Sequence, residues 1–172
     1  MRKQTIHDAN FFKKKKNSVT LLCDGELAPS NIGALFRIAD SFGIPKIHFK
    51  AKNFPIGSKR MERTSRTTHR LVPYSLQDDF GELIKSFKEN GVRCIGLEIT
   101  NDSMPIRDIA INPGENIALV VGHEKTGISK TVLDALDLVV HIPMYGLNSS
   151  MNVAVATGIG LYEITEKLQR SV

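Results

Sequence analysis

Apolar and polar residues alternate along the chain in blocks that predict a mixed α/β fold. Continuous apolar runs predict buried strands at residues 18–24, 46–49, 93–99, 116–122 and 136–143. Apolar residues at helical spacing predict helices over about residues 31–42 and 76–89, and a last helix that begins at Ser149 or Ser150. Apolar strands that alternate with amphipathic helices are typical of a parallel sheet that helices cover on both faces.

Local signals set the expected helix ends and the extent of the domain. Gly43 ends the first helix, and Ser75 with Asp78 predicts a capping box at the start of the second. The basic segment between the strand at 46–49 and the helix at 76–89 is expected to be a loop. No internal repeat, low-complexity tract or domain boundary is visible, so we expect one domain over residues 1–172. Its first 17 residues are then a basic extension, too short to form a separate domain of their own.

Composition favours a globular cytoplasmic protein. The 172 residues are 41% apolar and 24% charged, which is ordinary for a globular domain. No apolar run approaches the roughly 20 residues needed to span a bilayer, and the N-terminus lacks the apolar core of a signal peptide. Cys23 and Cys94 each lie within an apolar run, so we expect reduced core thiols, with neither a disulfide nor a metal site.

Positive charge is concentrated in two segments. The net charge of the chain is +5. The segment from Lys46 to Arg70 is rich in lysine and arginine and contains a single acidic residue, Glu62. Serine and threonine hydroxyls alternate with these cations, and both groups bind phosphate oxygens, which favours a nucleic acid partner over a solvated surface loop. The residues expected to bind it are Lys13, Lys14, Lys15, Lys16, Arg60, Arg63, Arg66 and Arg70.

The first candidate site opens the helix that follows the first strand. Ligands on parallel sheets bind outside the carboxyl ends of the strands, so the loops there are the natural places to search. Asn31 lies at the helix start, and Arg37 lies one turn beyond Gly33. The missing side chain at Gly33 is expected to leave space above Arg37 for a phosphate or hydroxyl group. The alternative is an exposed arginine beside a packing glycine.

The second candidate site follows the strand at 116–122. Gly122 and Gly127 have the separation of a Walker A motif, but Ile128 and Ser129 replace its Lys and Ser/Thr, which argues against an NTPase. We expect these glycines to let the loop lie against a flat organic ligand, with Glu124 directed at a cation or at backbone donors. A plain tight turn is the alternative.

The third candidate site precedes the last helix. Residues 146–152, GLNSSMN, gather small polar side chains immediately before an apolar helix. Serine can cap the exposed amides of a helix N-terminus, but capping accounts for only one of these polar residues. The remainder indicates a binding loop.

Together the three sites resemble the motifs of the SpoU family of RNA 2′-O-ribose methyltransferases. The resemblance covers roughly residues 18 to 168, in order, with Met151 where leucine is commoner and Ala154 where serine is common. The residues that carry it are Asn31-x-Gly33-Ala34-x-x-Arg37, then Gly122-x-Glu124-x-x-Gly127, then Ile142-Pro143-Met144, Ser150-Met151-Asn152-Val153-Ala154-Val155-Ala156 and Leu161-Tyr162-Glu163.

This resemblance implies a C-terminal deep trefoil knot, a rare exception to unthreaded topology. It also implies a homodimer, S-adenosylmethionine (SAM) as cofactor and RNA as substrate, with tRNA favoured over rRNA. The implied cofactor-binding residues are Leu97, Gly122, His123, Glu124, Gly127, Ile142, Met144, Gly146, Leu147, Ser150 and Met151. The implied catalytic residues are Asn31, Arg37, Glu124, Ser150 and Asn152.

The role of Arg37 can be weighed on physical grounds. Lowering the pKa of a guanidinium from about 13 to near 7 requires roughly 8 kcal/mol, so we prefer a phosphate clamp and alkoxide stabiliser to a general base. The base is then a transiently deprotonated arginine or a phosphate oxygen of the substrate. Glu124 is expected to orient backbone groups or the partner subunit, and Ser150 and Asn152 to hold Arg37 or the 3′ phosphate.

Two other classes of protein remain as alternatives. A non-catalytic knotted RNA-binding or ribosome-assembly protein has no reason to keep Arg37, Glu124 and Asn152 together. A small-molecule α/β enzyme fits the expected sheet but not the basic segment.

Overall fold

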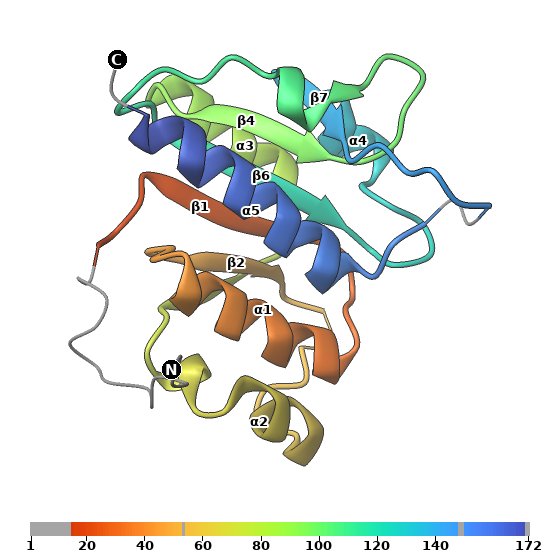
Figure 1. Cartoon of the computed structure of the whole chain (residues 1–172). Coiled ribbons are helices and arrows are strands. Elements are labelled where there is room, and N and C mark those ends of the chain that lie inside the picture. Colours follow the sequence, from red (N-terminus) through yellow and green to blue (C-terminus); the bar gives the residue numbers. More distant parts are fainter. Residues whose placement is uncertain (1–14, 53, 148–149, 171–172) are drawn as a thin grey trace, which may run out of the picture.

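The fold is built on a parallel sheet, seen in a computed structural model that describes residues 15–52, 54–147 and 150–170 (Figure 1). Within these residues, seven strands pair in the order β3-β2-β1-β6-β4-β7-β5, and each pairing is parallel. The strands are β1 (Val19–Asp24), β2 (Ile47–Lys50), β3 (Tyr74–Gln77), β4 (Arg93–Leu97), β5 (Met104–Pro105), β6 (Ile117–Gly122) and β7 (Leu138–His141).

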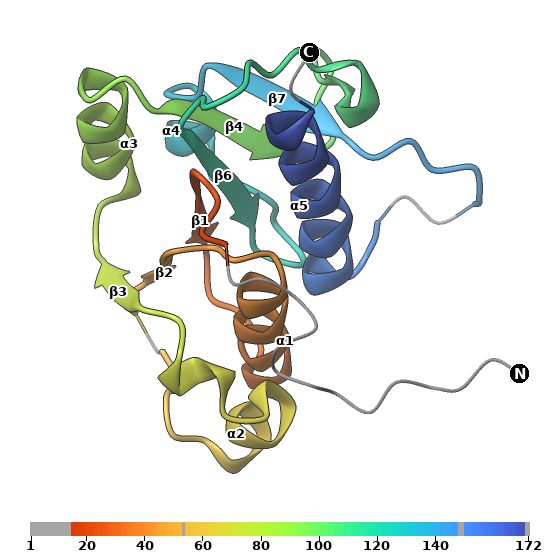
Figure 2. The same ribbon diagram turned by 60° about the vertical axis from the view of Figure 1, so that its left-hand side comes forward.

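Helices cover both faces of this sheet, as the hydrophobic pattern predicted. The helices are α1 (Pro29–Ser41), α2 (Lys59–Ser65), α3 (Phe80–Glu89), α4 (Lys130–Leu133) and α5 (Val153–Gln169), with short 3-10 turns at η1 (Thr68–Arg70) and η2 (Ile106–Asp108). Helices α1 and α5 lie side by side on one face, and α3 and α4 lie on the other (Figures 1 and 2).

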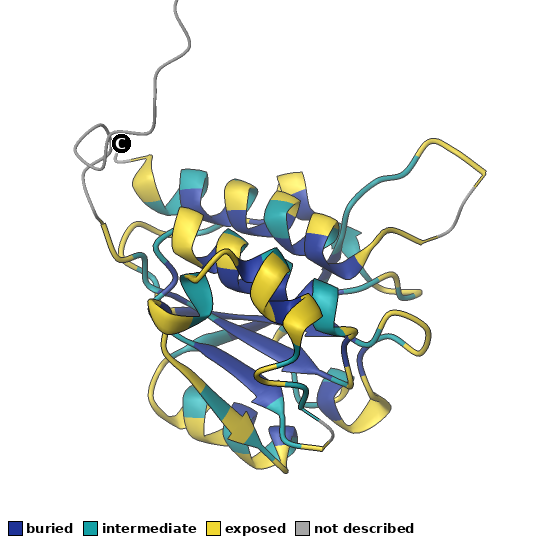
Figure 3. Cartoon of the chain, turned by 90° about the horizontal axis from the view of Figure 1, so that it is seen from below, coloured by how far each residue is buried: buried dark blue, intermediate teal, exposed yellow. Residues whose placement is uncertain are grey.

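Side-chain alternation along the central strands divides the interior into two cores. Leu21 packs into the core beneath α1 and α5, whereas its neighbour Leu22 packs into the core beneath α3 and α4. Because successive side chains of a strand point to opposite faces, a continuous apolar run supplies both cores at once. Figure 3 shows the result, with buried strands between helices whose outer surfaces are exposed.

The region between β2 and α3 differs from the sequence-based expectation. The basic segment contains α2, capped by Ser58, whose hydroxyl accepts from the Met61 amide at 3.3 Å. Residues 74–77 form the edge strand β3, so the predicted helix over 76–89 and its capping box are wrong at the start. The N-cap of α3 is Asp79, whose carboxylate accepts from the Glu82 amide at 3.1 Å. Pairing with β2 outweighs the local helical signal here.

The last helix also begins later than predicted. Asn152 is the N-cap of α5, and its Oδ1 accepts from the amides of Ala154 at 3.0 Å and Val155 at 3.2 Å. Asparagine at an N-cap satisfies amides that have no partner within the helix, so a start at Ser149 or Ser150 is wrong. Ser149 lies outside the described residues.

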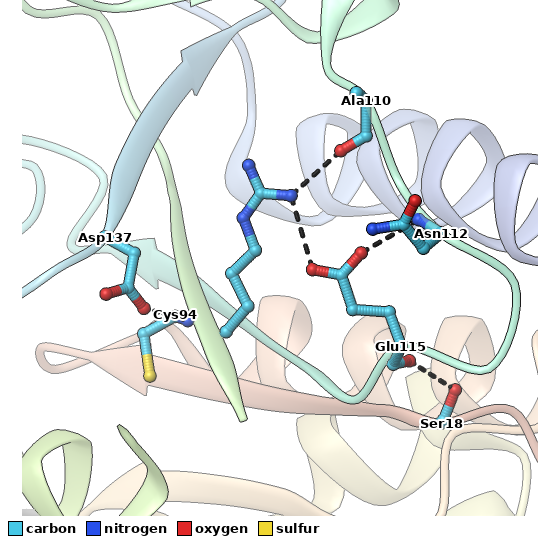
Figure 4. Close-up of polar contacts among 7 residues, drawn as sticks. Ser18, Cys94, Ala110, Asn112, Glu115 and Asp137 are labelled. Carbon is cyan, nitrogen blue, oxygen red and sulfur yellow. Dashed lines mark hydrogen bonds and ion pairs between the residues drawn. The ribbon is translucent and has the colours of Figure 1, made fainter. Parts of the chain in front are cut away.

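The amino edge of the sheet is closed by structural contacts (Figure 4). Arg93 Nη1 donates to the carbonyl of Ala110 at 2.8 Å and to Glu115 Oε1 at 3.3 Å. The carbonyl of Glu115 accepts from Ser18 Oγ at 2.7 Å, which ties the connection before β6 to the start of β1. These contacts leave the opposite, carboxyl edge as the place where strand ends and loops are open to a ligand.

Both cysteines are free and buried, as the sequence predicted. Burial raises the pKa of the Cys23 thiol, and burial together with the charge of Asp137 raises the pKa of Cys94 to about 11. Within residues 15–52, 54–147 and 150–170, the helices are all too short or too polar to cross a bilayer.

Candidate active site

A cavity of about 440 Å³ opens at the carboxyl edge of the sheet. The loops after β4, β6 and β7 and the first turns of α5 form its walls. Its lining residues are Leu97, Glu98, Ile99, Thr100, Val121, Gly122, His123, Glu124, Lys125, Thr126, Gly127, Ile128, Leu133, His141, Ile142, Met144, Ser150, Met151, Val153 and Ala156. This is the edge at which parallel sheets bind ligands.

Most of the residues expected to bind a cofactor line this cavity. They are Leu97, Gly122, His123, Glu124, Gly127, Ile142, Met144, Ser150 and Met151. Gly146 and Leu147 are exposed and do not contribute to its lining. The sequence reading missed the loop that follows β4, which brings Glu98, Ile99 and Thr100 to the cavity. The sequence analysis placed Glu98 and Ile99 inside a strand at 93–99, whereas β4 ends at Leu97, and the charged Glu98 after the apolar run was the signal that could have found this loop.

A chain of side-chain hydrogen bonds joins the three sequence motifs. The Asn31 Nδ2 group, at the start of α1, donates to the carboxylate of Glu124 in the loop after β6. Asn152 Nδ2 in turn donates to Asn31 Oδ1 at 3.1 Å, while Asn152 Oδ1 caps α5. Asn152 was expected to hold Arg37 or the 3′ phosphate of the substrate; within the described residues its side chain contacts Asn31 and the first amides of α5. The buried Asn31 links two exposed residues that belong to different strand-end loops.

The glycines of the loop after β6 are required by the loop itself. A side chain at Gly122 would meet the backbone of Gly127 and Ile128 at 2.2 Å. The backbone groups of His123 and Gly127 exchange hydrogen bonds of 3.0 and 2.9 Å across the turn. The tight-turn reading thus accounts for both glycines, although both also line the cavity.

Two carboxylates hold the far end of this loop from neighbouring strands. Glu98, after β4, accepts from the Ile128 amide at 3.1 Å through Oε2. Asp24, at the end of β1, accepts from the next amide, that of Ser129, at 2.9 Å and from the Ser129 hydroxyl at 2.6 Å. Asp24 is 4% exposed. Since β1 and β4 flank β6, the loop is fixed from both sides, and the sequence reading missed both acids.

Gly33 does not leave open space above Arg37. A side chain at Gly33 would meet the Met61 carbonyl at 2.5 Å, Thr64 Cβ at 2.8 Å and the Ser65 amide at 2.9 Å. Helix α2 therefore fills the volume that the sequence reading assigned to a ligand, and Gly33 allows the two helix backbones to approach closely.

Arg37 is exposed on α1 and does not line the cavity of its own chain. Within the part of the chain that the structure describes, its guanidinium has no hydrogen bond or ion pair. Its carbonyl accepts from Ser41 Oγ at 2.9 Å.

The candidate RNA-binding residues lie on the surface. Arg60 and Arg63 are exposed on α2, Arg70 is exposed in η1, and Arg66 follows α2 with a left-handed backbone conformation at φ 46°. Lys15 and Lys16 are exposed where the described chain begins, whereas Lys13 and Lys14 lie outside the described residues. Across residues 15–52, 54–147 and 150–170, no cluster of three or more His, Cys, Asp or Glu side chains could hold a metal ion.

This arrangement defines a protein of the parallel α/β class with a cavity at the carboxyl edge of its sheet. The model of the SpoU rRNA Methylase family matches residues 18–162, so the chain belongs to the SpoU family of RNA methylases. It is 30% identical over 156 residues to the 23S rRNA (guanosine-2′-O-)-methyltransferase RlmB of Blochmanniella floridana. This match covers 90% of this chain and 60% of the relative.

Two crystal structures have a similar fold. The TrmH/SpoU tRNA modifying enzyme of A. aeolicus is 27% identical with a TM-score of 0.80, and the match covers 90% of this chain and 77% of that one. The AdoMet-bound rRNA methyltransferase of Sinorhizobium meliloti is 22% identical with a TM-score of 0.81, over 91% of this chain and 59% of that one, which concerns the fold alone. Two of the curated relatives are matched over 60% and 68% of their length.

Proposed function

We propose that the protein transfers a methyl group from SAM to a ribose 2′-hydroxyl of structured RNA, with tRNA favoured over rRNA. The observation that carries this proposal is the hydrogen-bonded chain of Glu124, Asn31 and Asn152 beside the cavity. It gathers one polar residue from each of the three motifs, and Glu124 itself lines the cavity. A protein that only binds RNA needs no such assembly at a small-molecule cavity.

The cavity fits the proposed cofactor. Its volume of about 440 Å³ lies within the range of small-molecule sites, roughly 300 to 1,000 Å³. Leu97, Ile142 and Met144 offer apolar walls for the flat part of the molecule, and Glu98 offers a negative charge. Bound SAM would supply an electrophilic methyl group on a sulfonium centre. The groups of this chain would then hold the ribose hydroxyl in line with that methyl group, which is a large source of acceleration.

The proposal includes a homodimer, because one chain does not complete the site. Arg37 lies outside the cavity of its own chain, so we place it at the cavity of the partner. Helix α5 exposes Val155, Ile159 and Tyr162, with 54%, 39% and 57% of each residue accessible. An exposed apolar row of this kind suits contact with a second copy.

The proposal also includes the trefoil knot. Helix α5 lies across the centre of the sheet, where Gly160 approaches so closely that a side chain there would meet Leu97 Cδ2 at 2.9 Å. A C-terminal helix that is threaded through the loops after β6 and β7 would be packed in this way.

In the proposed reaction, Arg37 stabilises negative charge that develops on the ribose oxygen and clamps a neighbouring phosphate. Its fixed positive charge and planar donors suit both tasks. The hydroxyl proton passes to a substrate phosphate oxygen or to a transiently deprotonated arginine. Asn31 and Asn152 act by holding Glu124 and the start of α5 in place.

The test is transfer of labelled methyl from SAM to tRNA and rRNA transcripts, followed by digestion and mass spectrometry of the nucleosides. We expect 2′-O-methyl nucleosides with the wild-type protein and their loss with Arg37→Ala. Arg107→Ala is the matched control, because Arg107 is an exposed arginine of η2 away from the cavity. Label on a base atom would contradict ribose specificity. Binding of SAM and RNA without transfer would favour the non-catalytic RNA-binding alternative.

A further inference from the structure

Glu98 places a fixed negative charge in the wall of the cavity. It is half-buried directly after β4, and its two carboxylate oxygens accept from different backbone amides. Oε1 accepts from the Ile99 amide at 2.9 Å, and Oε2 accepts from the Ile128 amide at 3.1 Å. Two backbone donors from separate segments hold the carboxylate in one orientation. Glu98 also lines the cavity, which its role in holding the loop does not require.

Gly127 makes room for this carboxylate. A side chain at Gly127 would lie 2.4 Å from Glu98 Oε2, and the backbone of Gly127 has φ +68°, which L side chains rarely adopt. The loop therefore has a glycine at the point where the carboxylate approaches. This close approach brings the charge to the junction of the loops after β4 and β6, both of which line the cavity.

The other charged side chains of the cavity are less constrained. Glu124 and Lys125 are both exposed, and Glu124 is engaged by Asn31. Solvent screens exposed charges strongly, so their influence on a bound ligand is small compared with that of a half-buried one. Glu98 is thus the lining charge best placed to act on a ligand.

We propose that Glu98 is a specificity-determining residue that makes the cavity prefer the cationic SAM to its neutral product, S-adenosylhomocysteine (SAH). This inference rests on the proposed function. Methyl transfer breaks the carbon–sulfur bond and forms a carbon–oxygen bond, and the electron pair of the broken bond stays on sulfur. The hydroxyl proton leaves to the base. The two ligands therefore differ by one methyl group and one positive charge, so a fixed carboxylate discriminates between them and favours product release.

Asp24 provides a matched control on the other side of the same loop. It accepts from the Ser129 amide, directly after the amide that Glu98 holds, but it does not line the cavity. Asp24→Asn and Glu98→Gln each remove one negative charge and disturb the anchoring of the loop. Only Glu98→Gln removes a charge that faces the ligand.

The experiment measures the dissociation constants of SAM and SAH by calorimetry for the full chain and its variants. A partly solvated charge within a few ångströms of the sulfonium would change affinity by about threefold to thirtyfold. We expect the preference for SAM over SAH to fall by at least about threefold in Glu98→Gln and to stay unchanged in Asp24→Asn. Glu98→Asp keeps the charge but shortens the side chain, so both ligands should weaken while the preference survives. Thermal unfolding shows that each variant is folded.

Other outcomes overturn the inference. Equal weakening of both ligands in Glu98→Gln, with the preference intact, would show that Glu98 only anchors the loop. Loss of preference in both Glu98→Gln and Asp24→Asn would assign the effect to loop geometry instead of charge. A wild-type protein that binds neither ligand would overturn the proposed function and this inference with it.

Discussion

The side-chain amide of Asn31 donates a hydrogen bond to the carboxylate of Glu124, which lies 93 residues later in the chain. Asn152, 121 residues after Asn31, donates to the opposite end of the same amide group at 3.1 Å. One buried side chain thus connects the start of α1, the loop after β6 and the cap of α5. Disturbing Asn31 should therefore affect the stability of the fold as well as the site.

Asn31→Asp should destabilise the protein by about 1 to 3 kcal/mol at neutral pH, because a second carboxylate would face Glu124 and the donor would be lost. Repulsion should raise the pKa of one carboxyl in this variant, so the folded state binds a proton more readily than the unfolded state. The loss of stability of Asn31→Asp relative to the wild type should therefore shrink as the pH falls toward about 5. Asn31→Ala removes the hydrogen bonds to both Glu124 and Asn152 without adding charge, so its loss of stability should not shrink as the pH falls. Urea unfolding from pH 5 to 8 compares the two.

Arg37→Lys separates the two roles open to Arg37. If Arg37 acts as a clamp and electrostatic stabiliser, lysine keeps its charge but loses its planar set of donors. Turnover should then fall about tenfold to a thousandfold, which raises the activation free energy by roughly 1.4 to 4 kcal/mol, and some activity should remain. For a titrating base, lysine has the lower intrinsic pKa of about 10.4, so the pH optimum should move to lower pH. The pH–rate profile decides between them. A shift of a full unit toward acid, with normal folding and cofactor binding, would refute the clamp.

Loss of the exposed cations of α2 should weaken RNA binding across sequences. Arg60→Ala and Arg63→Ala should each reduce the slope of the logarithm of the RNA-binding constant against the logarithm of the salt concentration by nearly one unit, since each loses one phosphate contact. Neither substitution should change the affinity for SAM. Lys85→Ala is the control, since Lys85 is exposed on α3 at the opposite face of the sheet. Filter binding at several salt concentrations gives the slopes. Equal slopes in all three variants would show that α2 faces solvent.

Gly33→Ala should destabilise the protein by about 1 to 3 kcal/mol, because the added methyl group would meet backbone atoms of α2 at 2.5 and 2.9 Å. Backbone atoms cannot rotate away as a flexible side chain can. Gly158→Ala is the matched helical control, since its methyl group would meet only Ile38 Cδ1 at 3.8 Å. It should stabilise the protein by about 0.5 to 1 kcal/mol through helix propensity. Denaturant unfolding measures both, and equal effects would contradict close packing at Gly33.

His48 should make stability depend on pH. Burial and, to a smaller extent, the charge of Lys46 lower the pKa of its imidazole from 6.5 to about 4. The folded state therefore keeps His48 neutral, while the unfolded state takes up a proton below pH 6.5. The contribution of His48 to the free energy of unfolding is fully present above pH 6.5. This contribution should decline as the pH falls from 6.5 to 4, by about 3 kcal/mol at most.

His48→Gln removes this titration. Unfolding of the wild type and the variant from pH 7.5 to 4 should show a steeper decline in the wild type. The carboxylates titrate in both proteins, so the difference isolates His48. Parallel curves would mean that His48 accepts a proton without cost in the fold.

The sequence by itself determined the architecture of the core. The run at 18–24 places the apolar residues Leu21, Leu22 and Cys23 next to one another, and burial on both sides of a strand requires such consecutive apolar positions whatever the strand pairs with. Because strand ends of a parallel sheet share one edge, the position of Glu124 and Gly127 after a strand was also enough to place them at the ligand edge. These inferences depend on local periodicity and on chain order.

Only the tertiary structure decided what the individual polar residues and glycines do. The space beside Gly33 belongs to α2, Asn152 caps α5 and holds Asn31, and residues 74–77 pair with β2 as a strand. Each outcome depends on a partner that is distant in sequence, and local propensity does not predict contacts with such partners. Glu98 and Asp24 show the same limit, since two acids at the ends of different strands meet consecutive amides of one loop only after the sheet has formed.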